Sequence, residues 1–451
     1  MAPAVRTSLA QGPYRGNPTL AEVPCMPPSG PAAEPRDILL HEGVLAKFLR
    51  YVVIDTESDP AGTGVPTTPG QWDLSRLLAA EAQVMGLADV HCDDHGIVTA
   101  TIAGSPSPQN TGPTVGFLAH VDTSPAVSGR GVRPIVHRGY PGGPIALPGG
   151  PTLDPVDHPL LRAVVGHDIV TSDGTTLLGA DDKAGVAEIM AAAAHLLLHP
   201  EIVHGPIRLA FTTDEETGRG IEFLDPAAFG AEVAYTLDGG ALGEVSWENF
   251  NAENLCVVVE GRSAHTGSAR GHMCNAVHLA ATLVAAVPAG VRPETTAGGD
   301  GFIHFDQFSG NVERVTLTVL LRDFDASGLA AKRRWLEAQC AALRVLHPAC
   351  RVEITRTGGY RNMREAVQRR PEVGELALEA MRRVGVEPRP ALIRGGTDGA
   401  RLSERGLPTP NLFAGGMDFH SRTEWISVQW MEQATAVVVE LARLWAARDR
   451  R

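Results

Sequence analysis

Three consecutive carboxylates, Asp214, Glu215 and Glu216, follow an apolar run that ends at Phe211. Neighbouring side chains on a regular strand point to opposite faces, so Glu215 and Glu216 can reach one centre only through a turn. Taken alone, the segment fits a solvated acidic turn, because charge clusters at loop tips are usually exposed to water. A chemical role requires that other parts of the chain bring partners to this run.

Polar groups that could act with the acidic run stand at the ends of other expected strands. They are His120 and Asp122, Asp181 and Asp182, Asp238, and Asp418 with His420. In open α/β sheets, ligands bind outside the carboxyl ends of the strands, so these groups can converge on one crevice. Two imidazoles and three carboxylates are ligands that a pair of zinc-like cations would use. Such a pair would polarise a carbonyl group and lower the pKa of a bridging water.

Each of these groups also has a purely structural interpretation. His120 could be a core histidine, and Asp238 in the segment LDGG could be a turn residue. Asp181 and Asp182 could simply begin a helix, where acids suit the helix dipole. The metal-site hypothesis therefore depends on all of the groups occurring together.

The elements that would position these groups alternate along the chain. Apolar residues recur at helical spacing from residue 38 to 52, from about 73 to 86 and from about 183 to 198. Strands are expected in the segments TVGFLAHVDT, IRLAFTTDEE and VAYTLDGG, each with a polar end. This alternation predicts an α/β fold with a mixed, largely parallel sheet flanked by helices.

The pattern changes after residue 249. Residues 250–361 show a β-α-β-β-α-β-like order, which predicts a smaller inserted α+β domain. We call this segment the lid domain, and we expect residues 38–249 and 362–451 to form the main domain around it. Residues 1–37 are rich in proline and small residues and lack the apolar region of a signal peptide, so they predict a disordered tail.

Composition limits the partners of the chain. It has 451 residues, 43% of them hydrophobic, a formal net charge of -13 and no Lys/Arg-rich run, so neither nucleic acid nor an anionic membrane is expected to bind. No segment has about 18 consecutive apolar residues, which argues against a transmembrane helix. The six cysteines are scattered without a CxxC pair, which argues against a disulfide scaffold or a zinc ribbon and favours the cytoplasm.

Seven blocks of the sequence together resemble the peptidase T family, tripeptide aminopeptidases of the dizinc exopeptidase clan. In chain order the blocks are HVDT (120–123), LLGADDKAGVAEI (177–189), TTDEETGRG (212–220), YTLDGG (235–240), RSAHTGSARG (262–271), IRGGTDGA (393–400) and FAGGMDFH (413–420). The resemblance runs from about residue 38 to the end of the chain. It implies a zinc-exopeptidase-like catalytic domain, with the lid domain serving in dimerisation, and hydrolysis of the N-terminal residue from short peptides, above all tripeptides.

The resemblance also implies a metal-ligand set. His120 and Asp238 would bind one ion, Glu216 and His420 would bind the other, and Asp181 would bridge them. The expected cofactor is two Zn²⁺ per chain, for which Mn²⁺ or Co²⁺ could substitute because such sites select metals weakly.

Further roles follow from the same resemblance. Glu215 would be the general base, and Asp122 would orient His120 through its other ring nitrogen. The peptide bond between Asp181 and Asp182 is expected to be cis. Asp418 departs from the family pattern, in which an aromatic residue often stands at this position, so its carboxylate could disturb substrate binding or simply face water.

Four residues of the matching blocks or near them are candidates for substrate contacts. His265 would stabilise the oxyanion and reach a neighbouring active site across a homodimer, while Arg322, Arg394 and Asn311 would bind the peptide. A surface or ion-pair role is the alternative for each. Two rival functions stay open, another amide hydrolase of the clan such as a deacylase or carboxypeptidase, and a non-hydrolytic metal-binding protein. The absence of GxSxG, P-loop and GxGxxG motifs disfavours serine hydrolases and nucleotide enzymes.

Overall fold

The structure, a computed structural model, describes residues 34–107, 110 and 112–448. Helix α1 (Pro35–His41) begins inside the segment that we assigned to the N-terminal tail, with Asp37 in its first turn. Proline suits the start of a helix because the first N–H groups have no intrahelical acceptor. The tail boundary at residue 37 is therefore too late, and residues 1–33 of the predicted tail lie outside the described residues.

An eight-stranded mixed sheet has the strand order β1-β2-β8-β3-β9-β16-β10-β15. Its strands are β1 (Ala88–Cys92), β2 (Val98–Ile102), β3 (Val115–His120), β8 (Ile207–Thr212), β9 (Val233–Gly239), β10 (Glu244–Ser246), β15 (Arg389–Pro390) and β16 (Asn411–Phe413). The four neighbours β8, β3, β9 and β16 run parallel to one another. Strands β1, β2 and β10 form the antiparallel pairs β1–β2, β2–β8 and β10–β16. The expected mixed, largely parallel sheet is confirmed.

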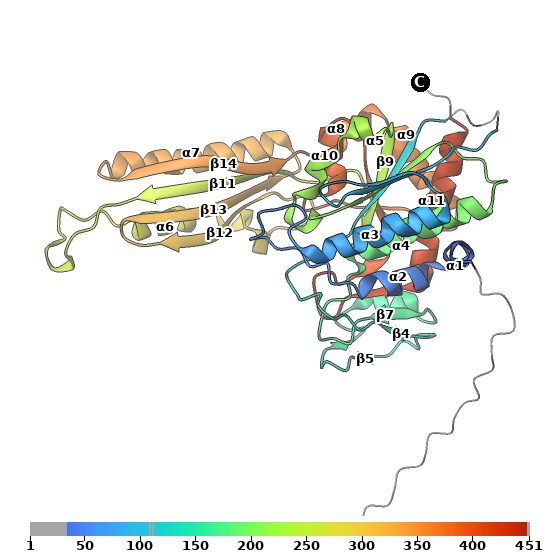
Figure 1. Ribbon diagram of the computed structural model, residues 1–451. Helices are drawn as coiled ribbons and strands as arrows, with labels where there is room; N and C mark the ends of the chain where they lie inside the picture. The colour runs from blue at the N-terminus through green and yellow to red at the C-terminus, as the bar shows by residue number, and fades with distance from the viewer. Residues whose placement is uncertain (1–33, 108–109, 111, 449–451) are drawn as a thin grey trace, which may run out of the picture. The chain divides into compact units, whose positions relative to one another are not determined.

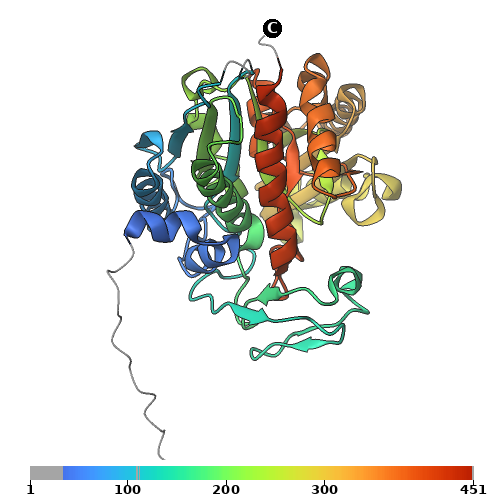
Figure 2. The ribbon, with the colours of Figure 1, turned by 90° about the vertical axis from the view of Figure 1, so that its right-hand side faces the viewer.

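Helices cover both faces of this sheet. On one face, α4 (Ala180–Leu198) and α11 (Val428–Ala446) lie side by side (Figure 2). The helices α2 (Val44–Val52), α3 (Pro69–Met85) and α9 (Glu372–Arg383) contribute to the same hydrophobic cluster. Phe117 of β3 packs into that cluster, while its neighbour Leu118 joins a second cluster with residues of α5 (Pro226–Phe229) and α10 (Asp398–Glu404). Successive residues of a strand point to opposite faces, so the parallel centre of the sheet is buried on both sides.

The lid domain contains its own antiparallel sheet, with strand order β12-β13-β11-β14 (Figure 1). Its elements are β11 (Asn251–Glu260), α6 (Ala276–Ala285), β12 (Phe302–Gly310), β13 (Arg314–Asp323), α7 (Ala326–Leu346) and β14 (Arg351–Tyr360). Alternate residues of β11 and β13 are buried in a separate hydrophobic cluster with α6 and α7. The β-α-β-β-α-β order is as expected, while the domain boundaries stay predictions.

A smaller part of the fold was not expected. Residues 135–153, for which the sequence predicts no strand, contain β4 (Ile135–His137), β5 (Ile145–Ala146) and β6 (Thr152–Leu153). Strand β4 joins β7 (Ile169–Thr171), β17 (Gly416–Met417) and β18 (Trp425–Ser427) in one sheet. Strands of two or three residues are too short to show an alternating pattern. The helix α8 (Arg364–Arg369) follows the lid domain, and no helix in the described part of the chain could cross a membrane.

Candidate metal centre and active site

The sheet brings the predicted strand-end groups to one edge. Strand β3 lies between β8 and β9 and runs parallel to both. His120 ends β3, Asp238 lies near the end of β9, and the acidic run begins two residues after the end of β8. Because carboxyl ends of parallel strands meet at one edge, these side chains share one crevice.

Two groups of metal-ligating side chains meet at Asp181. The first group is His120, Asp181 and Asp238, the second is Asp181, Glu216 and His420, and the ligand atoms within each group lie within 4.8 Å of one another. Asp181 Oδ1 lies 3.0 Å from His120 Nε2, and Asp181 Oδ2 lies 3.2 Å from His420 Nε2. One carboxylate thus faces both groups, as a bridging ligand must. The five residues predicted to bind metal come together, and their role as ligands stays a prediction.

The turn that holds the acidic run explains how adjacent glutamates reach one centre. Asp214 has a left-handed backbone with φ of 54°, and a short 3-10 helix follows at Glu215–Thr217. The Asp214 carboxylate is buried and accepts hydrogen bonds of 2.7 Å from Gln71 Nε2 and from the backbone N–H of Thr67. The run is therefore a structured turn with one acid anchored in the protein, and a solvated acidic turn does not describe it.

Asp122 links the histidine to the two glutamates. Its Oδ1 lies 3.3 Å from His120 Nδ1 and accepts a 3.0 Å hydrogen bond from the Glu215 N–H. Its Oδ2 accepts a 3.1 Å hydrogen bond from the Glu216 N–H. The carboxylate is fully buried, so it holds the imidazole and both backbone positions in one rigid arrangement.

The segment before helix α4 presents Asp181. Asp181 and Asp182 have non-helical backbone angles, and the peptide bond between them is cis, as the resemblance implied. Buried Glu424 accepts hydrogen bonds from the backbone N–H groups of Leu178 (2.7 Å), Gly179 (2.8 Å) and Asp181 (3.1 Å). Sequence reasoning missed Glu424, because an acid before a three-residue strand gives no signal that it folds back on a distant turn.

A second missed residue is Asp398, at the start of α10. Its Oδ2 accepts a 2.5 Å hydrogen bond from Thr212 Oγ1, two residues before the acidic run begins. Burial raises the pKa of Asp398 to about 7. The TDG segment matches a family block, which was the only signal that could have singled it out.

Electrostatics show how much negative charge the site concentrates. Burial, with the charge of Asp181, raises the pKa of Glu216 to about 7, and burial raises the pKa of Asp238 to about 6. Burial acts upward on the pKa of Asp181 as well, but hydrogen bonds with His120 and His420 lower it overall. A hydrogen bond with Asp181 and the nearby carboxylate of Glu216 raise the pKa of His420 to about 10. The buried acids repel one another, so nearby positive charge would stabilise them in the charged form.

This donor set fits divalent cations. Glu216 Oε1 is buried and has no hydrogen bond of acceptable geometry, although it lies 2.9 Å from His420 Nε2. Imidazole nitrogens and carboxylate oxygens without thiolate suit zinc-like ions. Positive charge between the two groups would offset the repulsion among the acids.

Arg322 lies in a cavity that Glu215 and Glu216 also line. Its Nη1 donates a 2.9 Å hydrogen bond to Asn254 Oδ1, and its guanidinium lies over the ring of Tyr360 at 5.5 Å from the centroid. These contacts fix the guanidinium, so its remaining N–H groups can meet a ligand in the cavity.

Arg394 lines the same cavity but is engaged with the lid domain. Its Nη1 donates to the carbonyl oxygens of Gly298 (2.7 Å) and Asp300 (2.9 Å), and Nη2 donates to Thr296 Oγ1 (3.0 Å). Its guanidinium also lies over the ring of Phe250. The structure thus gives Arg394 a clear role in holding the loop at 296–300, and substrate binding by it stays a prediction.

His265 and Asn311 lie away from the site in their own chain. Both side chains are exposed, and neither lines the two cavities beside Glu215 and Glu216. His265 Nδ1 accepts a 3.2 Å hydrogen bond from the Gly267 N–H, and Asn311 Oδ1 accepts one of 2.9 Å from the Glu313 N–H. Their predicted contacts with substrate could arise only through another chain or a movement.

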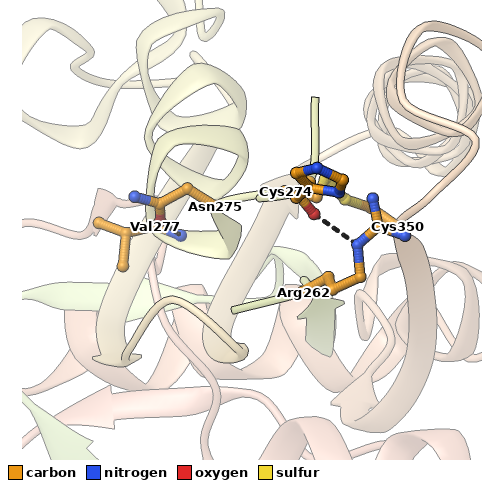
Figure 3. The surroundings of a disulfide bond; sticks show 6 residues. Arg262, Cys274, Asn275, Val277 and Cys350 are labelled. Carbon is orange, nitrogen blue, oxygen red and sulfur yellow. Dashed lines mark hydrogen bonds between the residues drawn. A yellow bond between two sulfur atoms is a disulfide. The ribbon is translucent and has the colours of Figure 1, made fainter. Parts of the chain in front are cut away.

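A disulfide joins Cys274 and Cys350 beside the base of the loop that carries His265 (Figure 3). Cys274 and Arg262 form a two-way backbone pair of 2.8 and 2.9 Å that closes this loop. No local pattern indicated this pairing, because the two cysteines are 76 residues apart in the chain. Disulfides are rare in cytosolic proteins, so the cytoplasmic location stays a prediction.

The Asp418 carboxylate is engaged in contacts with other side chains of the protein. Its Oδ2 lies 2.7 Å from His158 Nδ1 and accepts a 2.9 Å hydrogen bond from Trp425 Nε1. This departure from the family pattern therefore ties the loop before His420 to the small β4-β7 sheet region.

Comparison with known proteins decides the family. The model of peptidase family M20/M25/M40 matches residues 173–444, more than half of the chain. Peptidase T of Geobacillus thermodenitrificans is 45% identical over 410 residues, which cover 90% of this chain and 98% of the relative. Peptidase T of Salmonella newport is 45% identical over 407 residues, which cover 90% and 99%. The chain belongs to peptidase family M20/M25/M40. It is a metallopeptidase and an aminopeptidase of the peptidase T group.

Solved structures of M20-type peptidases support the fold. Aminopeptidase PepT from Bacillus cereus superposes with a TM-score of 0.68 at 22% identity, covering 90% of this chain and 98% of that one. A tripeptidase from Staphylococcus aureus superposes with a TM-score of 0.69 at 22% identity and the same coverage. The expected zinc-exopeptidase-like fold with its inserted α+β unit is therefore confirmed for this M20 peptidase.

Proposed function

We propose that this M20 peptidase removes the N-terminal residue from short peptides, preferentially tripeptides, and that two Zn²⁺ ions per chain serve as its cofactor. The observation that carries the proposal is the position of Asp181, whose two carboxylate oxygens face two separate His-carboxylate groups at 3.0 and 3.2 Å. His120 and Asp238 would hold one ion, and Glu216 and His420 the other. When bound, the ions would polarise the scissile carbonyl and lower the pKa of a water.

Glu215 supplies proton transfer in this proposal. Its side chain belongs to neither ligand group, and it lines both cavities beside the centre. Asp122 Oδ1 accepts a 3.0 Å hydrogen bond from the Glu215 N–H. This contact holds Glu215 next to the ligand residues, while its own carboxylate is not one of the ligands. From there it takes a proton from the attacking water and returns the proton to the leaving amine.

A peptide panel tests the proposed function. The zinc-loaded enzyme is incubated with di-, tri- and tetrapeptides that carry free or acetylated N-termini, and with N-acyl amino acids, while released amino acids are quantified. We expect the free tripeptide to be cleaved fastest, with its N-terminal residue as the first product. Release of the C-terminal residue, or cleavage of N-acyl amino acids alone, would show instead that the chain is a carboxypeptidase or a deacylase.

Arg322 is proposed to bind the terminal carboxylate of the peptide. A guanidinium offers a planar fork of N–H groups that matches a carboxylate, and the ammonium of lysine cannot reproduce this geometry. Arg322→Lys is therefore expected to raise KM for tripeptides by about 10-fold or more with a smaller change in kcat. Tripeptide amides, which lack the carboxylate, serve as the control substrate and should respond little. Equal losses on the acid and the amide would contradict this role.

We also propose a homodimer in which His265 of each chain acts at the site of the other, because His265 is exposed and lines neither cavity of its own chain. Preparations of His265→Ala and Glu215→Gln should each be nearly inactive. Mixing them under conditions that exchange subunits should restore part of the activity, since a hybrid dimer has one complete site. No recovery in verified hybrid dimers would refute a shared site.

A further inference from the structure

A second cavity beside the metal centre contains an acid that the mechanism does not use. The cavity has a volume of about 450 Å³ and is lined by the ligand residues Asp181, Glu216 and Asp238 at one wall. Three further carboxylates, Glu215, Glu244 and Asp418, also line it. Glu215 is the proposed base and Asp418 is engaged with His158 and Trp425, which leaves Glu244 as the carboxylate without a role.

Glu244 lacks a cationic partner among the residues that the structure describes. Its side chain is half-buried at the start of β10, and its carboxylate accepts a hydrogen bond from the backbone N–H of Ala241. No arginine, lysine or histidine within residues 34–107, 110 and 112–448 forms an ion pair with it. Arg389, which pairs with Glu244 in the β10–β15 ladder, is exposed and forms no such contact. Burying a charged carboxylate without a cationic partner costs free energy. A cationic group of a ligand that enters the cavity would therefore be stabilised beside Glu244.

The backbone around Glu244 keeps space open next to it. Asp238 and Glu244 stand at the two ends of the short turn that joins β9 to β10. A Cβ atom added to Gly240 would lie 3.0 Å from Glu244 Oε2 and 3.9 Å from the carbonyl oxygen of Gly416. The Glu244 carboxylate therefore lies next to Gly240 in the wall of the cavity, and a side chain at position 240 would crowd it.

The other cavity beside the centre contains arginines, which the Glu244 cavity lacks. It is lined by Arg322, Arg394 and Arg401 as well as by Glu222 and Asp398, and it shares Glu215 and Glu216 with the Glu244 cavity. A peptide whose scissile bond lies at Glu215 can thus extend its carboxyl end toward arginine and its amino end toward Glu244. This arrangement of charges complements a short zwitterionic peptide.

We infer that Glu244 accepts a charge-assisted hydrogen bond from the α-ammonium group of the substrate and so selects peptides with a free N-terminus. The inference rests on the proposed function, because only an aminopeptidase places an α-ammonium group next to the scissile bond. Glu244 is a specificity-determining residue in this view, and it neither binds the metals nor transfers protons.

Glu244→Gln tests the inference in the metal-loaded enzyme, with Ala-Ala-Ala and its N-acetyl form as probes. Hydrogen bonds to charged groups are stronger than neutral ones, so KM for the free peptide should rise about 10- to 100-fold with little change in kcat. The acetylated peptide carries no ammonium, so its cleavage should change little. The preference for the free peptide should therefore fall by the same factor. Metal content should equal that of the wild type.

A matched control makes the same chemical change elsewhere. Glu387 is exposed near the same sheet edge, and Glu387→Gln should leave both KM and the preference unchanged. Lys-Ala-Ala is compared with Ala-Ala-Ala, because a side-chain ammonium could also bind a carboxylate. If Glu244→Gln weakens only Lys-Ala-Ala, if it keeps the wild-type preference, or if it loses metal, the inference is wrong. A wild-type enzyme that fails to cleave Ala-Ala-Ala would refute the proposed function instead, so the two failures are distinguishable.

Discussion

Glu215→Gln is expected to lower kcat by a factor of roughly 10² to 10⁴, the range typical for loss of a general base. Glutamine keeps the size of the side chain but cannot accept the proton of a water at neutral pH. Glu215 is in neither ligand group, and Asp122 holds its backbone N–H at 3.0 Å, a contact that the substitution leaves intact. Metal content and substrate affinity should therefore match those of the wild type.

Two measurements on the same preparation check this expectation. Elemental analysis gives the metal content per chain, and single-turnover kinetics with a tripeptide give the rate of the chemical step. If Glu215→Gln loses metal and regains near-normal kcat once zinc is added, the roles of Glu215 and Glu216 are reversed. If kcat is unchanged throughout, Glu215 has no part in proton transfer.

Glu216→Gln is expected to fail in a different way, although the residue is adjacent and has the same charge. Glu216 Oε1 lies 2.9 Å from His420 Nε2 within the second ligand group. An amide is a much weaker ligand than a carboxylate for a zinc-like ion, so metal content should fall from two ions toward one per chain. Even substitutions beyond the direct ligands cost 10- to 100-fold in metal affinity, so activity at limiting zinc should fall at least about 100-fold.

Excess zinc separates the two glutamates. Because binding follows mass action, a high zinc concentration should restore part of the activity of Glu216→Gln and none of that of Glu215→Gln. Each substitution thus serves as the matched control of the other. Retention of both ions by Glu216→Gln at limiting zinc, together with normal activity, would contradict its place in the ligand set.

The predictable part of the fold came from local patterns. Runs such as VGFLAH and IRLAFT are long enough to show burial, and amphipathic spacing marks long helices such as α7. Strands of two or three residues carry no such pattern, so no strand was predicted at β4 or β7. The start of α1 was missed because Pro35 and Asp37 suit a helix start as well as a tail.

Side-chain partners distant in the sequence were beyond prediction. Glu424 binds the backbone near Asp181, 243 residues away in the case of the Asp181 N–H, and Asp418 pairs with His158 across the fold. The hydrogen bonds of Arg394 to the loop at 296–300 were likewise not foreseen, while its predicted binding of substrate stays a prediction. A sequence shows that an arginine or an acid is present, but only packing decides which neighbour satisfies it.

The sequence by itself determined the kinds of ligand and their order along the chain, because residue types and strand-end positions are local properties. The resemblance assigned roles to five ligands, a base and an orienting acid, and the structure brings all of them to one edge of the sheet. Only the tertiary structure decided that Asp214 turns inward to Gln71 while Glu215 and Glu216 face the centre. That choice depends on a left-handed turn and on hydrogen bonds between segments 143 residues apart, neither of which a local pattern contains.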